Sequence, residues 1–316
     1  MYGRENFKKI KTQIEERRRA AIAESEARCE AVRRQSARVR EIDEELSRTG
    51  LAIFRAAIAG EDIAPIKERN LALTSERNAQ IKKLGYPDGY TEIHYTCPIC
   101  SDTGFNDTNM CSCMKELLVL ESIKSSGIGR LIEKQSFDNL DLSWYADDQK
   151  NYERMKSNIE AARRFAADFH VPTSANLLLI GKTGTGKTHV STAIAKVVIE
   201  KGYEVLYDSA QNIVSAFEND RFKSGYGPYE PQGDKYLECD LLILDDLGTE
   251  FVNQFTVSCL YNLLNTRMNK GLATVISTNL TPEELSAKYE DRIYSRIVGS
   301  DSRILLFAGR DYRINR

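Results

Sequence analysis

A glycine-rich octapeptide that directly follows an apolar run constrains this 316-residue chain more than any other feature. The apolar run covers residues 177–180, and the octapeptide reads Gly-Lys-Thr-Gly-Thr-Gly-Lys-Thr over residues 181–188. Glycines in this pattern allow successive backbone N–H groups to turn toward a polyphosphate. We therefore predict a buried strand that leads into a phosphate-binding loop and then into a helix.

Lys187 and Thr188 carry the chemistry that this loop predicts. Lys187 is expected to reach the terminal phosphates, and the Thr188 hydroxyl is expected to hold Mg²⁺. An unrelated glycine-rich turn would have no need of a Lys-Thr pair after its last glycine. We therefore predict binding of a nucleoside triphosphate. The expected nucleotide-binding residues are Gly181, Thr183, Gly184, Thr185, Gly186, Lys187, Thr188 and His189.

Two further apolar runs end in polar side chains. Residues 241–244 lead into Asp245 and Asp246, and residues 273–277 lead into Thr278 and Asn279. Asp245 is expected to hold magnesium, and Asp246 to polarise an attacking water. Asn279 is expected to orient that water or to sense the γ-phosphate. The alternative is a strand followed by an acidic turn, with Asn279 as a turn residue.

Arginines are concentrated near the end of the sequence. A guanidinium beside the transferring phosphate accelerates phosphoryl transfer, and a neighbouring subunit can supply it. Arg292 and Arg296 are four residues apart and would share one face of a helix. A solvated basic surface is the alternative. The arginines in this region are Arg292, Arg296, Arg303, Arg310, Arg313 and Arg316.

These segments together resemble AAA+ ATPases of the bacterial replicative helicase loader group, the DnaC/DnaI type, over about residues 130–316. The resemblance implies ATP as the nucleotide, Arg292 as an arginine finger and Arg313 as a γ-phosphate sensor in its own subunit. It also implies that Phe137 lies near the adenine, although a core phenylalanine is the equal alternative. Many AAA+ proteins have glutamate at the position of Asp246, so we expect slow hydrolysis.

Four cysteines form a CxxC pair and a CxC pair separated by ten residues. They are Cys97, Cys100, Cys111 and Cys113. Four thiolates in so short a segment suit tetrahedral zinc, while a redox pair or free thiols are the alternatives. His94 is an alternative ligand if one cysteine drops out.

The region before the cysteines is rich in charged helix-forming residues. Gly50, Gly60 and Pro65 interrupt its apolar spacing, which favours a helical hairpin over a single rod. The apolar seam is poor, so the helices are expected either to dock on a partner or to form a solvated pair. We assign residues 1–90 to this partner-binding hairpin, residues 91–130 to a zinc module and linker, and residues 131–316 to the AAA+ domain.

The overall composition adds three expectations. The hydrophobic content of 41% suffices for a core, and no apolar stretch reaches membrane-spanning length. The first residues lack a signal-like apolar segment, so we expect a cytoplasmic protein without membrane contact. The charge balance of 44 basic and 46 acidic residues implies that any nucleic-acid contact is local.

The predicted fold class is therefore α/β: a P-loop AAA+ domain with a mostly parallel sheet, preceded by a helical hairpin and a small zinc-binding module. By resemblance, the chain is expected to load a hexameric replicative DNA helicase onto single-stranded DNA, and to self-associate through its AAA+ domain. Two alternatives stay open. One is an IstB-type transposition helper ATPase, and the other is a nucleotide-gated binding module with negligible hydrolysis.

Overall fold

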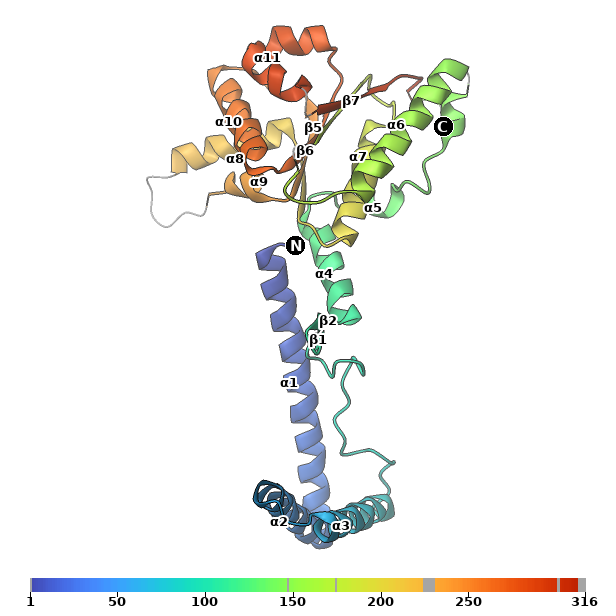
Figure 1. The fold of residues 1–316 in the computed structure, drawn as a ribbon, viewed down its shortest axis with the longest axis vertical. Helices are drawn as coiled ribbons and strands as arrows, with labels where there is room; N and C mark the ends of the chain where they lie inside the picture. The colour runs from blue at the N-terminus through green and yellow to red at the C-terminus, as the bar shows by residue number, and fades with distance from the viewer. Residues whose placement is uncertain (1, 147, 174, 224–230, 300–301, 312–316) are drawn as a thin grey trace. The chain divides into compact units, whose positions relative to one another are not determined.

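The computed structural model describes residues 2–146, 148–173, 175–223, 231–299 and 302–311. The chain forms two compact units (Figure 1). One unit is Lys11–Met114, and the other combines Met1–Ile10 with Lys115–Arg316. The division into residues 1–90, 91–130 and 131–316 that the sequence suggests stays a prediction.

A five-stranded sheet forms the centre of the second unit. Its strands lie in the order β4-β5-β6-β3-β7, and all four pairings are parallel. Long apolar runs suit such strands, because a parallel sheet is buried on both faces. The predicted α/β class with a mostly parallel sheet is confirmed. The strands are β3 (Asn176–Gly181), β4 (Val205–Ser209), β5 (Leu241–Leu247), β6 (Ala273–Thr278) and β7 (Ser302–Phe307).

Helices cover both faces of this sheet (Figure 1). Leu177 and Leu179 point into one apolar core, which contains residues of α6 (Gln149–Ala167) and α7 (Lys187–Glu200). The alternate side chains Leu178 and Ile180 belong to the core on the other face. The helices of that face are α8 (Ala210–Lys223), α9 (Asp234–Glu238), α10 (Gln254–Lys270) and α11 (Pro282–Val298). The unit is therefore a three-layer α/β/α sandwich.

Strand β7 was not expected from the sequence. Its six residues include Arg303, and three of them are exposed because the strand lies at the sheet edge. The apolar pattern is therefore weaker than in the central strands. Arg313, the expected γ-phosphate sensor, lies outside the described residues.

The helical region contains three helices, of which the last two pair as a hairpin. These are α1 (Arg4–Gln35), α2 (Ala37–Ala59) and α3 (Ala64–Lys83). Ser36 caps α2 by accepting a hydrogen bond from Val39 N, and Gly60 ends it with a left-handed φ of 72°. Pro65 lies in the first turn of α3, where its missing N–H costs nothing. Gly50, by contrast, lies within α2 and interrupts nothing.

The remaining elements lie between the hairpin and the sheet in sequence. They are β1 (Phe105–Asn106), β2 (Asn109–Met110), α4 (Ser112–Ser125), α5 (Leu131–Lys134) and a 3-10 turn at Leu142–Tyr145. Strands β1 and β2 form a short antiparallel ribbon. Across the described parts of the chain, no helix combines the length and the apolar character that a membrane span requires.

Candidate functional site

The glycine-rich loop connects the end of β3 to the start of α7, as the sequence predicts. Gly184 and Gly186 have φ values of 76° and 94°, which side-chain-bearing residues rarely adopt. At Gly186 a Cβ atom would lie 2.6 Å from the Tyr145 hydroxyl. At Gly184 it would lie 1.8 Å from a carboxylate oxygen of Asp311. The left-handed backbone therefore favours glycine at both positions, and the Tyr145 and Asp311 side chains lie against the loop.

Lys187 is held inside the loop. Its Nζ donates to the carbonyl oxygen of Gly181 at 2.6 Å and to that of Lys182 at 2.9 Å. Only 6% of the residue is exposed. The Thr185 hydroxyl donates to the Lys182 carbonyl at 2.7 Å, and the Tyr145 hydroxyl donates to the Thr185 carbonyl at 2.9 Å. These bonds fix the ammonium group at the helix N-terminus, where anions bind.

A pocket lies directly against this loop. It is bounded by the loop, by the segment that precedes α6, and by residues after β5 and β6. Apart from Gly181, every loop residue expected to bind the nucleotide lines it. The lining residues are Gln135, Asn139, Leu140, Asp141, Trp144, Tyr145, Thr183, Gly184, Thr185, Gly186, Lys187, Thr188, His189, Asp246, Thr249 and Asn279.

The parallel strand order brings the predicted groups together. Strand β6 lies between β3 and β5, so the loop after β3, the carboxylates of β5 and Asn279 after β6 share one edge of the sheet. Asn279 is exposed and faces the pocket from directly beyond the end of β6.

The two neighbouring carboxylates have different surroundings. Asp245 is buried and accepts hydrogen bonds from the hydroxyls of Tyr207 and Ser277. Asp246 is exposed, lines the pocket and has a left-handed φ of 53°. A register shift in the β5–β6 pairing between Leu244 and Leu247 re-aims these side chains. The structure thus separates a fixed, buried carboxylate from one that faces the pocket.

Tyr207 is a site residue that the sequence analysis missed. It lies on β4, and no motif spacing marks it. Burial, and then the charge of Asp245 that accepts its hydrogen bond, raise the pKa of Tyr207 well above its ordinary value. The hydroxyl therefore stays protonated and remains a donor to Asp245.

His189 contacts the segment that precedes the 3-10 turn, and Phe137 belongs to that segment. The Nε2 atom of His189 lies 2.9 Å from the Ser136 carbonyl oxygen and 3.1 Å from Asn139 Oδ1. Phe137 is 7% exposed and packs in the core, with the Arg163 guanidinium 5.1 Å from its ring centre. Phe137 is not among the pocket-lining residues, so its surroundings match the core interpretation rather than an adenine contact.

Trp144 and Tyr145, which the sequence analysis did not single out, line the pocket instead. They lie in the 3-10 turn that precedes α6. Aromatic side chains in a turn have no diagnostic period, so only their place just before a phosphate-binding unit could have marked them.

The C-terminal arginines separate into different environments. The Arg296 guanidinium lies 4.2 Å from the Tyr261 ring centre and donates to Asn265 Oδ1 and to the Tyr261 hydroxyl. Arg292 is exposed, and within the described part of the chain its guanidinium makes neither a hydrogen bond nor an ion pair. A kink at Tyr289 and Glu290 divides α11 just before it.

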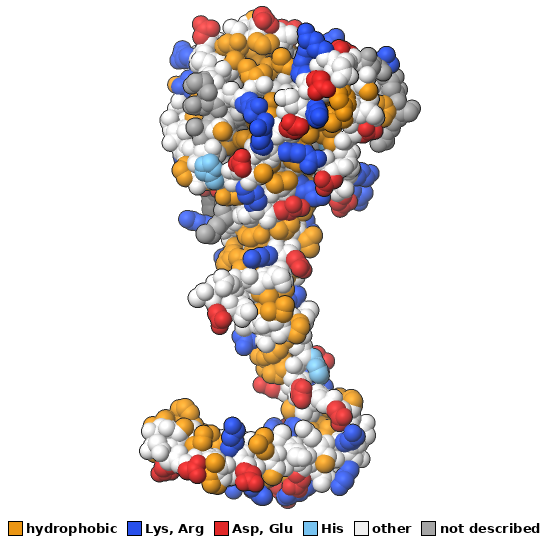
Figure 2. All heavy atoms as spheres, turned by 45° about the vertical axis from the view of Figure 1, so that its right-hand side comes forward, with side chains coloured by type: hydrophobic (Ala, Val, Ile, Leu, Met, Phe, Trp, Pro, Cys, Tyr) orange, Lys and Arg blue, Asp and Glu red, His pale blue; other side chains and the backbone are white. Residues whose placement is uncertain are grey.

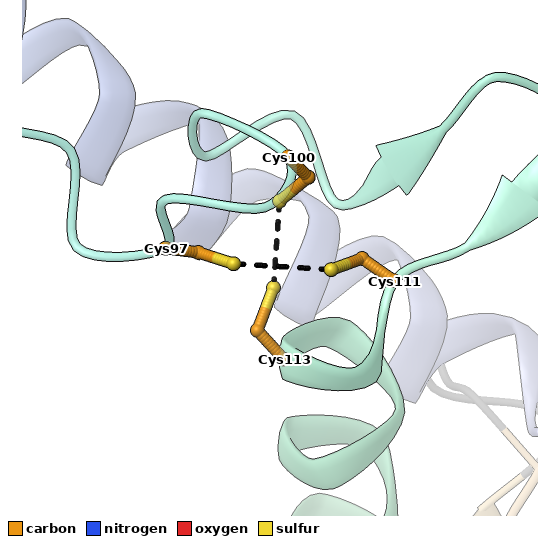
Figure 3. A group of neighbouring side chains, drawn as sticks. All are labelled: Cys97, Cys100, Cys111 and Cys113. Carbon is orange, nitrogen blue, oxygen red and sulfur yellow. Dashed lines mark hydrogen bonds between the residues drawn. The ribbon is translucent and has the colours of Figure 1, made fainter.

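The four cysteines converge on one point (Figure 3). Their sulfur atoms all lie within 4.8 Å of one another, with 3.8 Å between Cys97 and Cys111 and 3.6 Å between Cys100 and Cys113. A tetrahedron with zinc–sulfur bonds of about 2.3 Å has sulfur–sulfur edges of about 3.8 Å. The donor set and its spacing fit zinc. His94 is exposed and is not part of this cluster.

Hydrogen bonds around the cysteines hold the cluster in place. Asp102 is fully buried and accepts from the backbone N–H groups of Thr96 and Cys97, at 2.8 and 3.0 Å, and from Arg17 at 3.1 Å. Burial opposes ionisation of Cys100, but hydrogen bonds from the Gly104 N–H and the neighbouring thiols lower its pKa. Burial and the same thiols raise the pKa of Cys113, so the thiols interact with one another as one group.

Comparison with known proteins agrees with this geometry. The family model of IstB-like ATP binding proteins matches residues 148–305, which is half of the chain. The chain belongs to the IstB-like ATP-binding protein family. The family thus supports ATP binding, and the pocket against the glycine-rich loop is the candidate site for it.

Individual relatives of this IstB-like protein include a helicase loader and a transposition protein. The replicative helicase loader DnaC of Escherichia coli (strain K12) is 25% identical over 188 residues, which are 60% of this chain and 73% of that protein. An insertion sequence ATP-binding protein of Sinorhizobium fredii (strain NBRC 101917 / NGR234) is 32% identical over 116 residues, 37% of this chain and 38% of that protein.

A crystal structure of the DnaC helicase loader aligns with a TM-score of 0.47 at 19% identity, and covers 56% of this chain and 98% of that one. The predicted resemblance to DnaC-type AAA+ loaders is confirmed by the family match and the sequence relatives.

The site predicts the effects of two substitutions. Lys187→Ala removes the buried ammonium group. Because hydrogen bonds to a charged group contribute about 1.5–3 kcal/mol, we expect roughly a 10- to 100-fold loss of ATP affinity. Asp245→Asn keeps the shape of the side chain but removes its charge, so magnesium-dependent phosphate release should stop. Equilibrium nucleotide binding and phosphate release measure the two effects. Lys196→Ala, on the same helix, is the control. Near-normal turnover in both variants would contradict the site.

Proposed function

We propose that the chain is an ATP-dependent loader that places a ring-shaped, hexameric replicative DNA helicase onto single-stranded DNA in the cytoplasm. The observation that carries this proposal is the match to a replicative helicase loader, at 25% identity over 188 residues, together with the pocket against the glycine-rich loop. The pocket supports an ATPase, and the helical hairpin offers a separate surface for a partner. ATP hydrolysis, the partner and the DNA are all parts of the proposal.

The residues of the pocket suit hydrolysis of ATP. Thr188 and Asp245 are the oxygen donors that would hold Mg²⁺, and the metal when bound neutralises charge on the phosphates. Lys187 holds the terminal phosphates, because its ammonium group is fixed within the loop. Asp246 faces the pocket and can polarise a water, which Asn279 can orient from the neighbouring strand end.

A loading assay tests the proposed function. The replicative helicase of the native cell is incubated with closed circular single-stranded DNA, this chain and ATP, and the helicase bound to DNA is then counted after gel filtration. We expect DNA-bound helicase only when the chain and ATP are both present. Helicase that loads equally well without the chain, or never loads with it, would overturn the proposal.

A second candidate function is a transposition helper of the IstB type. The family itself and the relative from an insertion sequence favour it. Such a protein would assemble on duplex DNA beside a transposase rather than deliver a helicase. ATP-dependent binding to duplex DNA in the absence of single strands, together with a negative loading assay, would select this alternative.

The helical hairpin presents an apolar face that supports partner binding. Leu51, Phe54 and Ile58 follow one another at helical spacing on α2, and their exposed fractions are 61%, 66% and 74%. Leu71 on α3 is 63% exposed. Figure 2 shows hydrophobic and charged side chains side by side on these helices, at the bottom of the view. Exposed apolar rows of this kind mark protein interaction sites.

We predict that Phe54→Ser weakens helicase binding by about 10-fold or more, because truncation of an exposed aromatic anchor costs about 2 kcal/mol at an interface. Phe222→Ser, at a phenylalanine of similar exposure on α8, is the matched control and should bind as the wild type does. Calorimetric titration of the helicase measures both. Equal affinity for both variants would show that the hairpin face is not the contact.

The cysteine cluster is proposed to hold one zinc ion per chain. Metal binding and local folding are coupled in such small modules, so Cys113→Ser should lose most of the metal and increase hydrogen exchange over residues 94–115. Cys29→Ser, whose thiol lies outside the cluster in the same unit, should keep the metal. Elemental analysis checks both variants. Wild-type protein purified without chelator and lacking zinc would contradict the proposal.

Arg292 is proposed to complete the ATP site of a neighbouring subunit in a self-associated form, whereas Arg313 acts in its own subunit. Arg292 is exposed and its helix is tied to the chain after β5, because Lys288 donates to the Gly248 carbonyl and Tyr289 donates to Glu250. These contacts hold the part of α11 that ends at the kink, and Arg292 lies exposed directly after that kink.

We expect Arg292→Ala to bind ATP nearly as well as the wild type and to hydrolyse it about 100-fold or more slowly. Mixing Arg292→Ala with Lys187→Ala should restore some turnover, because each supplies what the other lacks. Arg303→Ala, at an exposed arginine of β7, is the control for loss of surface charge. If the two variants co-assemble but their mixture hydrolyses ATP no faster than the sum of the separate variants, Arg292 has a surface role instead.

A further inference from the structure

The Tyr207 hydroxyl contacts Asp245, one of the two residues expected to hold magnesium. It donates to one carboxylate oxygen of Asp245, whose other oxygen accepts from the Ser277 hydroxyl. An ionised carboxylate only accepts, so the phenol proton points to Asp245.

This order of donors leaves Asp245 with free lone pairs. Each of its oxygens accepts one hydroxyl proton and keeps a further lone pair that is available to a cation. Hydrogen bonds to metal-binding carboxylates orient them and tune the affinity of the site. Tyr207 thus ties β4 to the carboxylate of β5.

The backbone of Tyr207 is held from two sides. On one side, β4 pairs with β5, with Tyr207 opposite Ile243. The Tyr207 N–H donates to the carbonyl of Ser126 at 2.7 Å, directly after the end of α4. Gly127 is close to the Tyr207 carbonyl, because a Cβ at Gly127 would lie 2.4 Å from that oxygen. The chain that follows α4 therefore packs against the residue that donates to Asp245.

We propose that Tyr207 is a positioning residue for magnesium, and that the segment after α4 sets the position of Tyr207. The proposal rests on the magnesium-dependent ATP binding proposed above. It assigns a role in nucleotide binding to β4, a strand that carries none of the recognised motifs. It also predicts that changes at residues 126–127 alter the metal requirement without any contact with the nucleotide.

The test is calorimetric ATP binding at a series of Mg²⁺ concentrations. Tyr207→Phe keeps the ring and removes the hydroxyl, and should raise the Mg²⁺ concentration for half-maximal tight binding by about 10-fold or more. ATP affinity in EDTA should stay within about twofold of the wild type. Tyr203→Phe is the control, because Tyr203 packs edge-on against Phe169 away from the ligands. An unchanged Mg²⁺ requirement in Tyr207→Phe would overturn the proposal.

A pair of glycine variants tests the part played by the segment after α4. Gly127→Ala places a Cβ against the Tyr207 carbonyl and should also raise the Mg²⁺ requirement. Gly129→Ala carries a similar left-handed strain, with a φ of 59°, but its Cβ meets nothing within 4 Å. Equal requirements in the two variants would show that the segment does not set Tyr207. Wild-type ATP binding that ignores Mg²⁺ would instead overturn the proposed function.

Discussion

The parallel pairing of β5, β6 and β3 is the constraint on which the site depends. Parallel strands end at the same edge of a sheet, and β6 lies between the other two. Three segments far apart in sequence therefore end within reach of one phosphate chain. Each strand is buried on both faces by helices, so small movements of one strand end are costly. The fold in this way holds charged groups in fixed positions, although they would otherwise repel one another and move apart.

Chemically similar residues have different surroundings in this fold. Asp245 is buried beneath two hydroxyl donors, whereas Asp246 turns outward through a left-handed backbone conformation. The Arg296 guanidinium contacts Tyr261, whereas Arg292, one helical turn away, is exposed. In each pair the neighbouring residues decide which group is structural and which can meet a substrate or another subunit.

The sequence predicted the parts of the site that depend on local spacing. The glycine-rich loop, the Asp245–Asp246 pair and the cysteine spacing each specify chemistry within a few residues. The structure brings the loop and Asp246 to one pocket and gathers the four cysteines, while the roles of these residues stay predictions. Contacts made across the sheet could not be predicted, because they depend on strand order rather than on spacing. Tyr207 is the clearest case, since β4 comes next to β5 only in the folded sheet. Trp144 similarly reaches the pocket from an irregular turn.

The central claim is that ATP binds in the pocket between the glycine-rich loop and the turn before α6. The chain has one tryptophan, and Trp144 lines this pocket with 37% of its surface exposed. Titration of magnesium ATP while tryptophan emission is recorded therefore tests whether ATP binds in this pocket. We expect a saturable change in emission whose midpoint equals the dissociation constant from equilibrium dialysis. ATP that binds by dialysis but leaves the emission of Trp144 unchanged would contradict it.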